Sequence, residues 1–354
     1  MEPRLLFDSP DLRLLHVPSE GEDGPLIVTF SPLVHKDFDP PIGFGQDFFA
    51  KRGLAALHFI SGVPHWWQRP AIVQAVEAAQ AITRRHDQVV TYGSSMGGYG
   101  ALIHSKALGA TKVIAAAPQF SIDPAKAPFE HRWPHHASKL SFEWDDMENG
   151  ISASAIKYVI FDPLSIDRMH VKLLPPANIE PVALPFCGHA PLAYLRKLES
   201  LSSTVLSMID GSFDAAALKG KVRANRRGNW GYWLEMAKHR YNHQRFAAAI
   251  EILNHAKAMA PDPIAIRIKL AQALARAGNL TAAVEEIDEA ARRRPNHRAA
   301  VKIRKDMLDS ALRSQSGPGE LHALHQRYSS IIDTDENLSA LFTRLASQLN
   351  PNGQ

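Results

Sequence analysis

The sequence is organised around residues 88–101, which read QVVTYGSSMGGYGA. The apolar run that opens this stretch is typical of a buried strand in a parallel sheet, and the small residues that follow it predict a helix over 98–108. Between them lies Gly93-Ser94-Ser95-Met96-Gly97, a G-x-S-x-G pattern on a strand-to-helix turn. Such a sharp turn needs residues without side chains on both sides of its serine, because the backbone there lies against neighbouring elements. Gly93 and Gly97 meet that need.

Up to about residue 210, short aliphatic runs alternate with helix-like stretches. This alternation predicts a mainly parallel sheet with crossover helices. A further helix is expected over 71–85, opened by Pro70. The expected strands occupy 12–16, 26–30, 54–60, 88–92, 112–116, 157–161 and 181–184.

The turn places Ser95 at the N-terminal end of a helix, where free N–H groups favour a developing negative charge. Ser95 is therefore the expected nucleophile, and the Met96 amide is the expected first donor of an oxyanion hole. The second donor should follow an early strand. Pro32 has no N–H, so Leu33 is the candidate. A phosphate-binding loop is the alternative reading of the glycines, but the Lys-Ser/Thr ending of that loop is missing.

A serine hydroxyl needs a base to remove its proton, and in folds with this turn the acid and then the histidine follow the serine along the chain. His189, in a Gly-His step after the expected strand 181–184, is the candidate base. The loop after strand 157–161 holds two candidate acids, Asp162 and Asp167. Asp167 is preferred because the acid commonly lies a few residues beyond the strand, and Asp162 stays the alternative.

With these residues in this order, positions 1 to about 210 resemble the α/β-hydrolase superfamily. The resemblance implies a Ser-His-Asp triad and acyl chemistry on an ester, thioester or amide through an acyl-Ser95 intermediate. It also implies that an aromatic-rich insertion at about 118–155 acts as a lid over the serine. Trp133 within this insertion, and Trp67 after strand 54–60, are candidate walls of a substrate pocket.

Beyond residue 229 strand signals are missing, and one fixed shift superimposes Ala237 on Ala271 and Ala249 on Ala283. This period of about 34 residues is that of the tetratricopeptide repeat, which the segment resembles. The predicted organisation is a catalytic α/β domain over 1–215, a basic linker over 216–229, and an all-α repeat domain with C-terminal capping helices over 230–354.

Composition narrows the function. The chain has 354 residues, a net charge of +4 and a single cysteine, Cys187, which cannot form an internal disulfide. No apolar run is long enough to span a membrane. Basic residues cluster at 219–227, 292–294 and 302–305, but neither interleaved aromatic residues nor a nucleic-acid motif accompanies them. We expect a cytoplasmic protein without nucleic-acid partners. His131, His135 and His136 lack further ligands in a suitable arrangement, so no metal and no cofactor is expected.

The sequence therefore predicts a carboxylesterase-like serine hydrolase for a small-molecule or glycan-linked ester. Its repeat domain is expected to bind a protein partner or mediate self-association. Two alternatives remain open. The same triad would also serve an acyltransferase that passes the acyl group to a glycan hydroxyl, and a non-catalytic hydrolase-like scaffold would use only the repeats.

Overall fold

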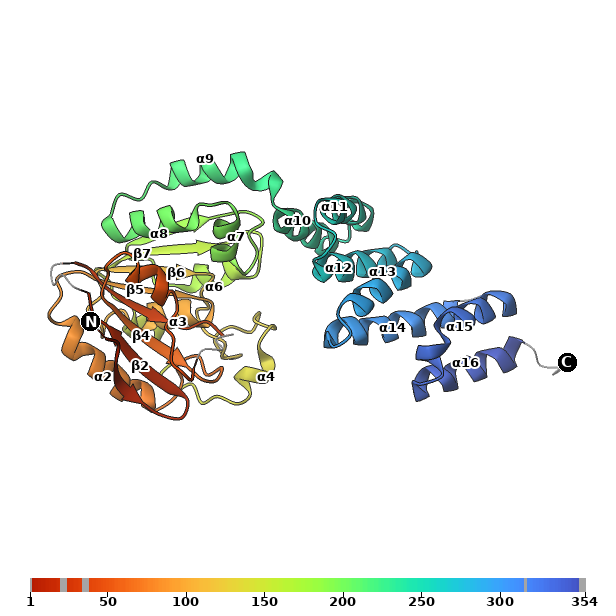
Figure 1. Ribbon diagram of the computed structural model, residues 1–354, viewed down its shortest axis with the longest axis horizontal. Coiled ribbons are helices and arrows are strands. Elements are labelled where there is room, and N and C mark those ends of the chain that lie inside the picture. The colour runs from red at the N-terminus through yellow and green to blue at the C-terminus, as the bar shows by residue number, and fades with distance from the viewer. Residues whose placement is uncertain (1, 20–23, 34–37, 315–316, 350–354) are drawn as a thin grey trace. The chain divides into compact units, whose positions relative to one another are not determined.

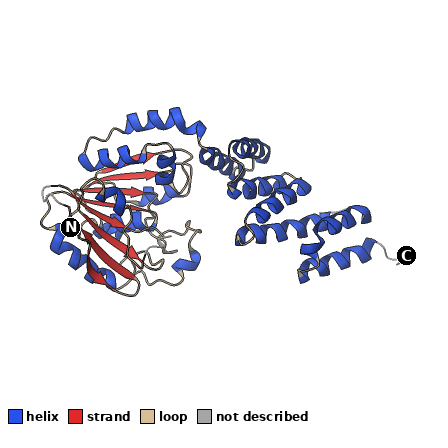
Figure 2. Cartoon of the chain, viewed as in Figure 1, coloured by secondary structure: helices blue, strands red, loops and turns tan. Residues whose placement is uncertain are grey.

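The computed structural model describes residues 2–19, 24–33, 38–314 and 317–349. The chain divides into two compact units, Met1–Asn229 and Trp230–Gln354. Figure 2 shows that the strands belong to the first unit and that the second unit is helical. Each unit has its own buried core.

The first unit is built on an eight-stranded sheet with the order β1-β2-β4-β3-β5-β6-β7-β8. β2 pairs antiparallel with β1 and β4, and all other neighbouring strands run parallel. Every residue of β3 and β4 is buried, as expected for parallel strands covered on both faces. The strands are β1 (Arg4–Asp8), β2 (Leu12–Val17), β3 (Leu26–Phe30), β4 (Ala56–Ser61), β5 (Val89–Ser94), β6 (Lys112–Ala116), β7 (Ile156–Phe161) and β8 (Ile179–Ala183).

Helices lie on both faces of this sheet (Figure 1). Successive residues of β5 point to opposite faces. Thr91 donates its hydroxyl to the Ala101 carbonyl of α3, whereas Tyr92 packs against Phe49 of α1 on the other face. The helices of this part are α1 (Gln46–Ala50), α2 (Ala71–Thr83), α3 (Met96–Ile103), α6 (Asp167–Leu173), α7 (Pro191–Lys197) and α8 (Leu201–Asp210).

The insertion between β6 and β7 contains two short helices, α4 (Pro134–Ala137) and α5 (Met147–Gly150). A buried carboxylate, Asp145, fixes it to the rest of the unit. The Asp145 oxygens accept hydrogen bonds from the Tyr99 hydroxyl of α3 at 2.7 Å and from the Ser121 hydroxyl at 2.6 Å. The insertion therefore rests on the helix that follows Ser95.

The segment 216–229, expected to be a basic linker, is largely helical. It contains most of α9 (Ala215–Asn225) and a turn of 3₁₀ helix, η1 (Arg226–Gly228). The Asp214 side chain caps α9 by accepting from the Ala216 and Ala217 amides. The clustered basic residues occupy the exposed side of this helix, while Leu218 and Val222 are buried.

In the second unit, each helix from α10 to α13 packs against the next helix in sequence, and α16 packs against both α14 and α15. α12 begins one repeat length after α10, and α13 begins the same interval after α11. The aligned alanines of the two repeats, such as Ala237 and Ala271, are fully buried. The helices are α10 (Trp230–Asn242), α11 (Phe246–Met259), α12 (Ile264–Arg276), α13 (Leu280–Arg293), α14 (Arg298–Ser314), α15 (Pro318–Ile332) and α16 (Glu336–Leu349).

The final helix, α16, buries Leu338 and Leu341 and leaves Glu336 and Arg344 on its outer side. This polar outer face is what a terminal helix of a repeat array requires. Among the helices described, none combines the length and apolar character needed to cross a bilayer.

Candidate functional site

Ser95 lies on the sharp turn between β5 and α3, with φ 55° and ψ −120°. A side chain at either flanking glycine would collide with backbone. A Cβ on Gly93 would lie 2.1 Å from the Gly97 carbonyl oxygen, and one on Gly97 would lie 2.2 Å from the Phe30 carbonyl oxygen. The turn is pinned by the Ser95 amide, which donates to the Ala116 carbonyl of β6 at 2.8 Å. The serine is thus held in a conformation that these two glycines make possible.

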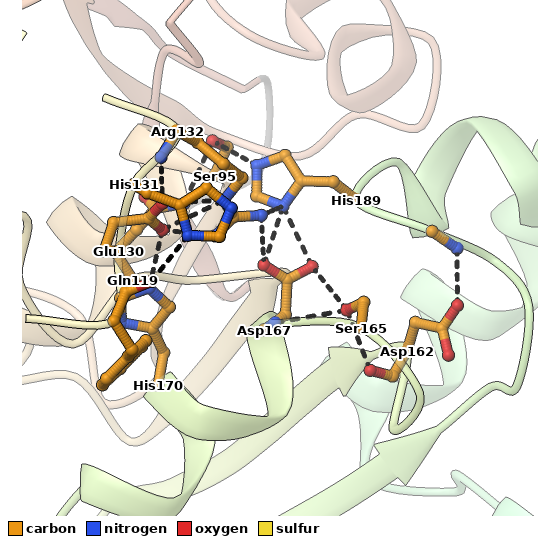
Figure 3. Close-up of polar contacts among 12 residues, drawn as sticks. Ser95, Gln119, Glu130, His131, Arg132, Asp162, Ser165, Asp167, His170 and His189 are labelled. Carbon is orange, nitrogen blue, oxygen red and sulfur yellow. Dashed lines mark hydrogen bonds and ion pairs between the residues drawn. The ribbon is translucent and has the colours of Figure 1, made fainter. Parts of the chain in front are cut away.

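Ser95, His189 and Asp167 form a continuous hydrogen-bonded relay (Figure 3). The Ser95 hydroxyl lies 2.9 Å from His189 Nε2, and His189 Nδ1 lies 2.9 and 3.0 Å from the two carboxylate oxygens of Asp167. The three residues follow β5, β8 and β7, so they meet at the carboxyl edge of the parallel sheet. Asp167 is fully buried, whereas the His189 side chain is 29% exposed. A histidine that solvent can reach is thereby held by a carboxylate that water cannot reach.

The alternative acid, Asp162, has different partners. One of its oxygens accepts from the Leu164 amide, and the other accepts from the Gly188 amide, both at 2.9 Å. Asp162 therefore ties the loop after β7 to the backbone just before His189. It holds the histidine loop in place while Asp167 contacts the imidazole.

Burial alone would raise the pKa of Asp167, but hydrogen bonds and charge from His189 and Arg132 outweigh it and hold the pKa below its usual value. Asp162 has no such cation against it. Burial raises the pKa of Asp162 above the ordinary range, although the Leu164 and Gly188 amides act in the opposite direction. The geometry and the charge both favour Asp167 as the carboxylate that faces the histidine.

The two backbone amides predicted to form the oxyanion hole, those of Met96 and Leu33, lie in different surroundings. Met96 is the first residue of α3, so its N–H has no partner within the helix. Leu33 is half-buried in a bend directly before residues 34–37, which lie outside the described chain. A residue that the sequence analysis missed, Gln119, points its amide at the serine, with Nε2 3.4 Å from Ser95 Oγ. The Gln119 carbonyl oxygen accepts from Trp66 Nε1, which fixes the orientation of the amide.

A second cluster of charges, also missed from the sequence, adjoins the acid. Arg132, from the insertion, donates from one terminal nitrogen to Asp167 at 2.7 Å, and the same nitrogen lies 3.1 Å from His189 Nδ1. Its other nitrogens bind the carboxylate of Glu130. Glu130 in turn contacts His170 of α6, with 2.8 Å between the Glu130 oxygen and His170 Nε2. No sequence signal marked these residues, because they are brought together only by the fold.

The two tryptophans expected to line a substrate pocket differ in burial and in their contacts. Trp67 is fully buried, and its indole N–H donates to the Met96 carbonyl at 2.8 Å, so it supports the serine turn from behind and cannot line a pocket. Trp133 is half-buried with its ring centre 6.0 Å from the His189 ring. It packs against Trp66, which is also buried. None of these tryptophans is among the residues that line the cavity beside His189.

A cavity of about 710 Å³ opens beside His189 on the sheet face that carries α1, α7 and α8. Pro32 and Ser94 also line it, so it reaches the carboxyl ends of β3 and β5. Its remaining wall is mainly apolar, and Arg196 and Glu199 at its border are exposed. The larger apolar lining residues are Phe44, Phe48, Tyr92, Leu192, Leu201 and Val205, and Ala190 and Ala193 lie between them.

The histidines of the insertion are not arranged around a common point. Pro134 opens α4, at a helix position that tolerates proline, so His131 lies before the helix and does not share a face with His135. Across the described residues, no group of three or more His, Cys, Asp or Glu side chains could hold a metal ion.

The sheet order, its parallel strands and the serine on the β5–α3 turn define an α/β-hydrolase fold, followed in the second unit by helical repeats. The predicted fold class is thus confirmed. Residues 214–305 match the sequence model described as tetratricopeptide repeat. This match begins within the first unit, just before α9.

No curated protein matches the sequence. Among solved structures, the chain is similar to a capsule O-acetyltransferase of Neisseria meningitidis serogroup A, with 14% identity, a TM-score of 0.39, and coverage of 56% of this chain and 93% of that one. It is also similar to Est1E from Butyrivibrio proteoclasticus, with 12% identity, a TM-score of 0.41, and coverage of 59% and 99%. A fluorophosphonate-binding serine hydrolase of Staphylococcus aureus, FphF, shows 13% identity, a TM-score of 0.35, and coverage of 51% and 89%.

Proposed function

We propose that this chain is a serine hydrolase that cleaves carboxylic esters through an acyl-Ser95 intermediate. The observation that carries the proposal is the unbroken relay from the Ser95 hydroxyl through both nitrogens of His189 to the buried Asp167 carboxylate. A serine is a weak nucleophile until a base within hydrogen-bond reach takes its proton, and His189 Nε2 is placed for that task.

In this proposal Ser95 Oγ attacks the ester carbonyl as its proton passes to His189 Nε2. Asp167 holds Nδ1–H, which fixes the tautomer and stabilises the imidazolium that forms. The Met96 amide donates a hydrogen bond to the carbonyl oxygen as negative charge develops on it, with Gln119 as a side-chain donor and Leu33 as the remaining backbone candidate. The imidazolium then protonates the leaving alcohol. Water, activated by the same histidine, attacks the acyl-serine and releases the acid.

The cavity beside His189 supports a substrate with an apolar group. Cavities of this size enclose most of a small organic ligand, and apolar walls favour alkyl chains or rings over hydrated sugars. The substrate, whether a small-molecule ester or a glycan-linked ester, should therefore carry an apolar group on one side of the scissile bond.

We further propose a protein-binding or self-associating role for the helical repeats, because tetratricopeptide-like arrays present extended surfaces for such contacts. A cytoplasmic location is proposed as well. It rests on the single cysteine of the chain, which cannot form an internal disulfide.

The test is covalent labelling of the full chain with a short fluorophosphonate, read by intact mass. Wild type should gain one adduct. Ser95→Ala should gain none, and His189→Ala should label more slowly by roughly 10²-fold or more. Ser203→Ala is the matched control, because it removes an exposed hydroxyl of α8 outside the cavity wall and should label like wild type.

An adduct that persists in Ser95→Ala would overturn the proposal. So would a folded wild type that takes no label and turns over no ester, a result that would favour the scaffold alternative. With an active protein, product analysis in the presence and absence of a polyol would separate release to water from transfer to a hydroxyl.

A further inference from the structure

Two further charged side chains adjoin the acid and the base of the relay, and each of the two carboxylates in this group of four faces a basic side chain. Asp167 faces His189, and Glu130 faces Arg132. Arg132 links the two pairs, since one of its terminal nitrogens lies 2.7 Å from Asp167 Oδ1 and 3.1 Å from His189 Nδ1 (Figure 3). The carboxylates of Asp167 and Glu130 are both fully buried.

An arginine in this place has two opposing effects on a base that must become positive. Its hydrogen bond holds the Asp167 carboxylate in the orientation that receives His189 Nδ1–H. Its charge, however, opposes the imidazolium, because like charges this close repel each other when both groups are largely shielded from water. A guanidinium beside the histidine is compatible with proton transfer only if another group offsets its charge.

Glu130 is placed to provide that offset. It accepts hydrogen bonds from Nε and a terminal nitrogen of Arg132, and from the Arg132 backbone amide at 2.8 Å. On its other side His170 accepts the Phe120 amide at Nδ1, which leaves the Nε2 proton to bind Glu130. A neutral histidine in this tautomer holds the carboxylate in place without cancelling its charge.

We propose, resting on the proposed function, that Arg132 and Glu130 are positioning residues that act as one unit: Arg132 orients Asp167, and Glu130 neutralises Arg132 so that His189 can take the serine proton. Both residues belong to the insertion between β6 and β7. The insertion thus supplies the surroundings of the acid.

If the two residues act in this way, removing Arg132 should restore part of the labelling rate that is lost when Glu130 loses its charge. A purely structural role does not predict this recovery. Glu130→Gln keeps the shape and one of the two accepting oxygens but removes the negative charge, which leaves Arg132 unbalanced. We expect Ser95 labelling by a fluorophosphonate to slow about 10- to 100-fold, a part of the roughly 10²- to 10⁴-fold that a positioned base contributes. Adding Arg132→Met to Glu130→Gln removes the unbalanced charge, so the double variant should label faster than Glu130→Gln alone.

The experiment measures labelling rates for wild type, Glu130→Gln, Arg132→Met and the double variant, with circular dichroism and thermal melts to set a temperature at which all four are folded. Glu143→Gln is the matched control, because it removes an exposed carboxylate of the same insertion and should leave the rate unchanged. A double variant that is as slow as Glu130→Gln or slower would overturn the proposal. So would a Glu130→Gln rate equal to that of wild type. Failure of wild type itself to label at Ser95 would instead reject the proposed function.

Discussion

Asp162 and Asp167 both follow β7, but they have different partners. Substitution of each by asparagine should therefore have different effects on rate and stability. Asp167→Asn keeps the size of the side chain but presents an amide to His189, which favours the wrong tautomer. We expect a rate loss on the order of 10⁴-fold in labelling and ester turnover, with little change in fold. Asp162→Asn loses one of the two buried backbone bonds instead, so we expect a stability loss of about 1–3 kcal/mol with the chemistry retained in the folded fraction.

Labelling kinetics and urea unfolding on both variants check this prediction. If Asp162→Asn loses the rate and Asp167→Asn keeps it, the assignment of the acid is reversed.

Glu130 gives a pH dependence whose sign follows from its surroundings. Burial acts to raise its pKa, but hydrogen bonds from His170 and Arg132 prevail and lower the pKa from 4.5 to about 2. A carboxyl group with a depressed folded-state pKa stabilises the fold at pH values above its unfolded pKa, and that contribution is lost as the pH falls through the folded pKa. Wild type should therefore lose stability between about pH 4.5 and about pH 2.

Glu130→Gln has no proton to gain there, so its melting temperature should fall less steeply over this interval. Thermal melts at several pH values, with Glu143→Gln as the control, measure the difference. Parallel curves for wild type and Glu130→Gln would mean that the pair with Arg132 contributes nothing to acid stability.

At the scale of elements, the cavity is enclosed by α1, α7 and α8, and Ala193 of α7 is a small half-buried residue in its wall. Each methylene that enters an apolar cavity gains about 0.8 kcal/mol, close to fourfold in kcat/KM. Turnover should rise with chain length in esters lengthened on the side that enters the cavity. Ala193→Phe fills part of this space and should flatten the dependence while leaving turnover of the shortest ester nearly unchanged.

Two ester series, one lengthened in the acyl group and one in the alcohol, identify the side that enters. Ser203→Trp adds bulk at an exposed position of α8 outside the cavity wall and is the control. A wild-type rate independent of length in both series, with Ser95 still labelled by the short probe, would leave the cavity without a role in substrate binding.

The elements that have a clear local sequence pattern were predictable from the sequence. The buried runs of β3 and β6 and the turn at Ser95 lie where expected, because burial on both faces and the glycine requirement leave a local trace. β1 was missed, since an exposed edge strand with a register irregularity and charged ends lacks a clear alternation. α9 was mistaken for a linker because charge on its exposed face obscured the buried Leu218 and Val222.

The site was predictable only where residues follow strand ends in a fixed order. Ser95, Asp167 and His189 could be proposed because parallel strands deliver their carboxyl ends to one edge. Gln119, Glu130 and Arg132 could not, because they reach the site from an insertion whose path depends on tertiary contacts such as Tyr99 to Asp145. The burial of Trp67 was not predictable either, because Trp66 and Trp67 both adopt positive φ values that no local pattern in the sequence indicates.

At the scale of the whole molecule, the two units have separate cores, so a substitution in the repeats should change the stability of the repeats alone. The turn of the first repeat offers a sensitive position. Gln244 has φ 58°, and Gly278, its counterpart in the second repeat, has φ 87°. Both amides bond back to equivalent carbonyls, those of Tyr241 and Ala275. The two turns therefore share one backbone shape, which suits glycine and strains glutamine.

Gln244→Gly should remove a left-handed strain of about 1–2 kcal/mol, partly offset by the greater freedom of glycine in the unfolded chain, for a net gain of about 0.5–1 kcal/mol. Gly278→Ala is the mirror control. A Cβ there would meet no atom within 4 Å, so its cost is conformational and should reach about 1–2 kcal/mol. Hydrogen exchange read by mass spectrometry in increasing urea follows each unit separately. Protection of α10–α13 should rise with Gln244→Gly and fall with Gly278→Ala, while protection of β5 and β6 stays unchanged. A shift of the sheet by the same amount would show instead that the two units unfold as one, and that the helical repeats contribute directly to the stability of the site around Ser95.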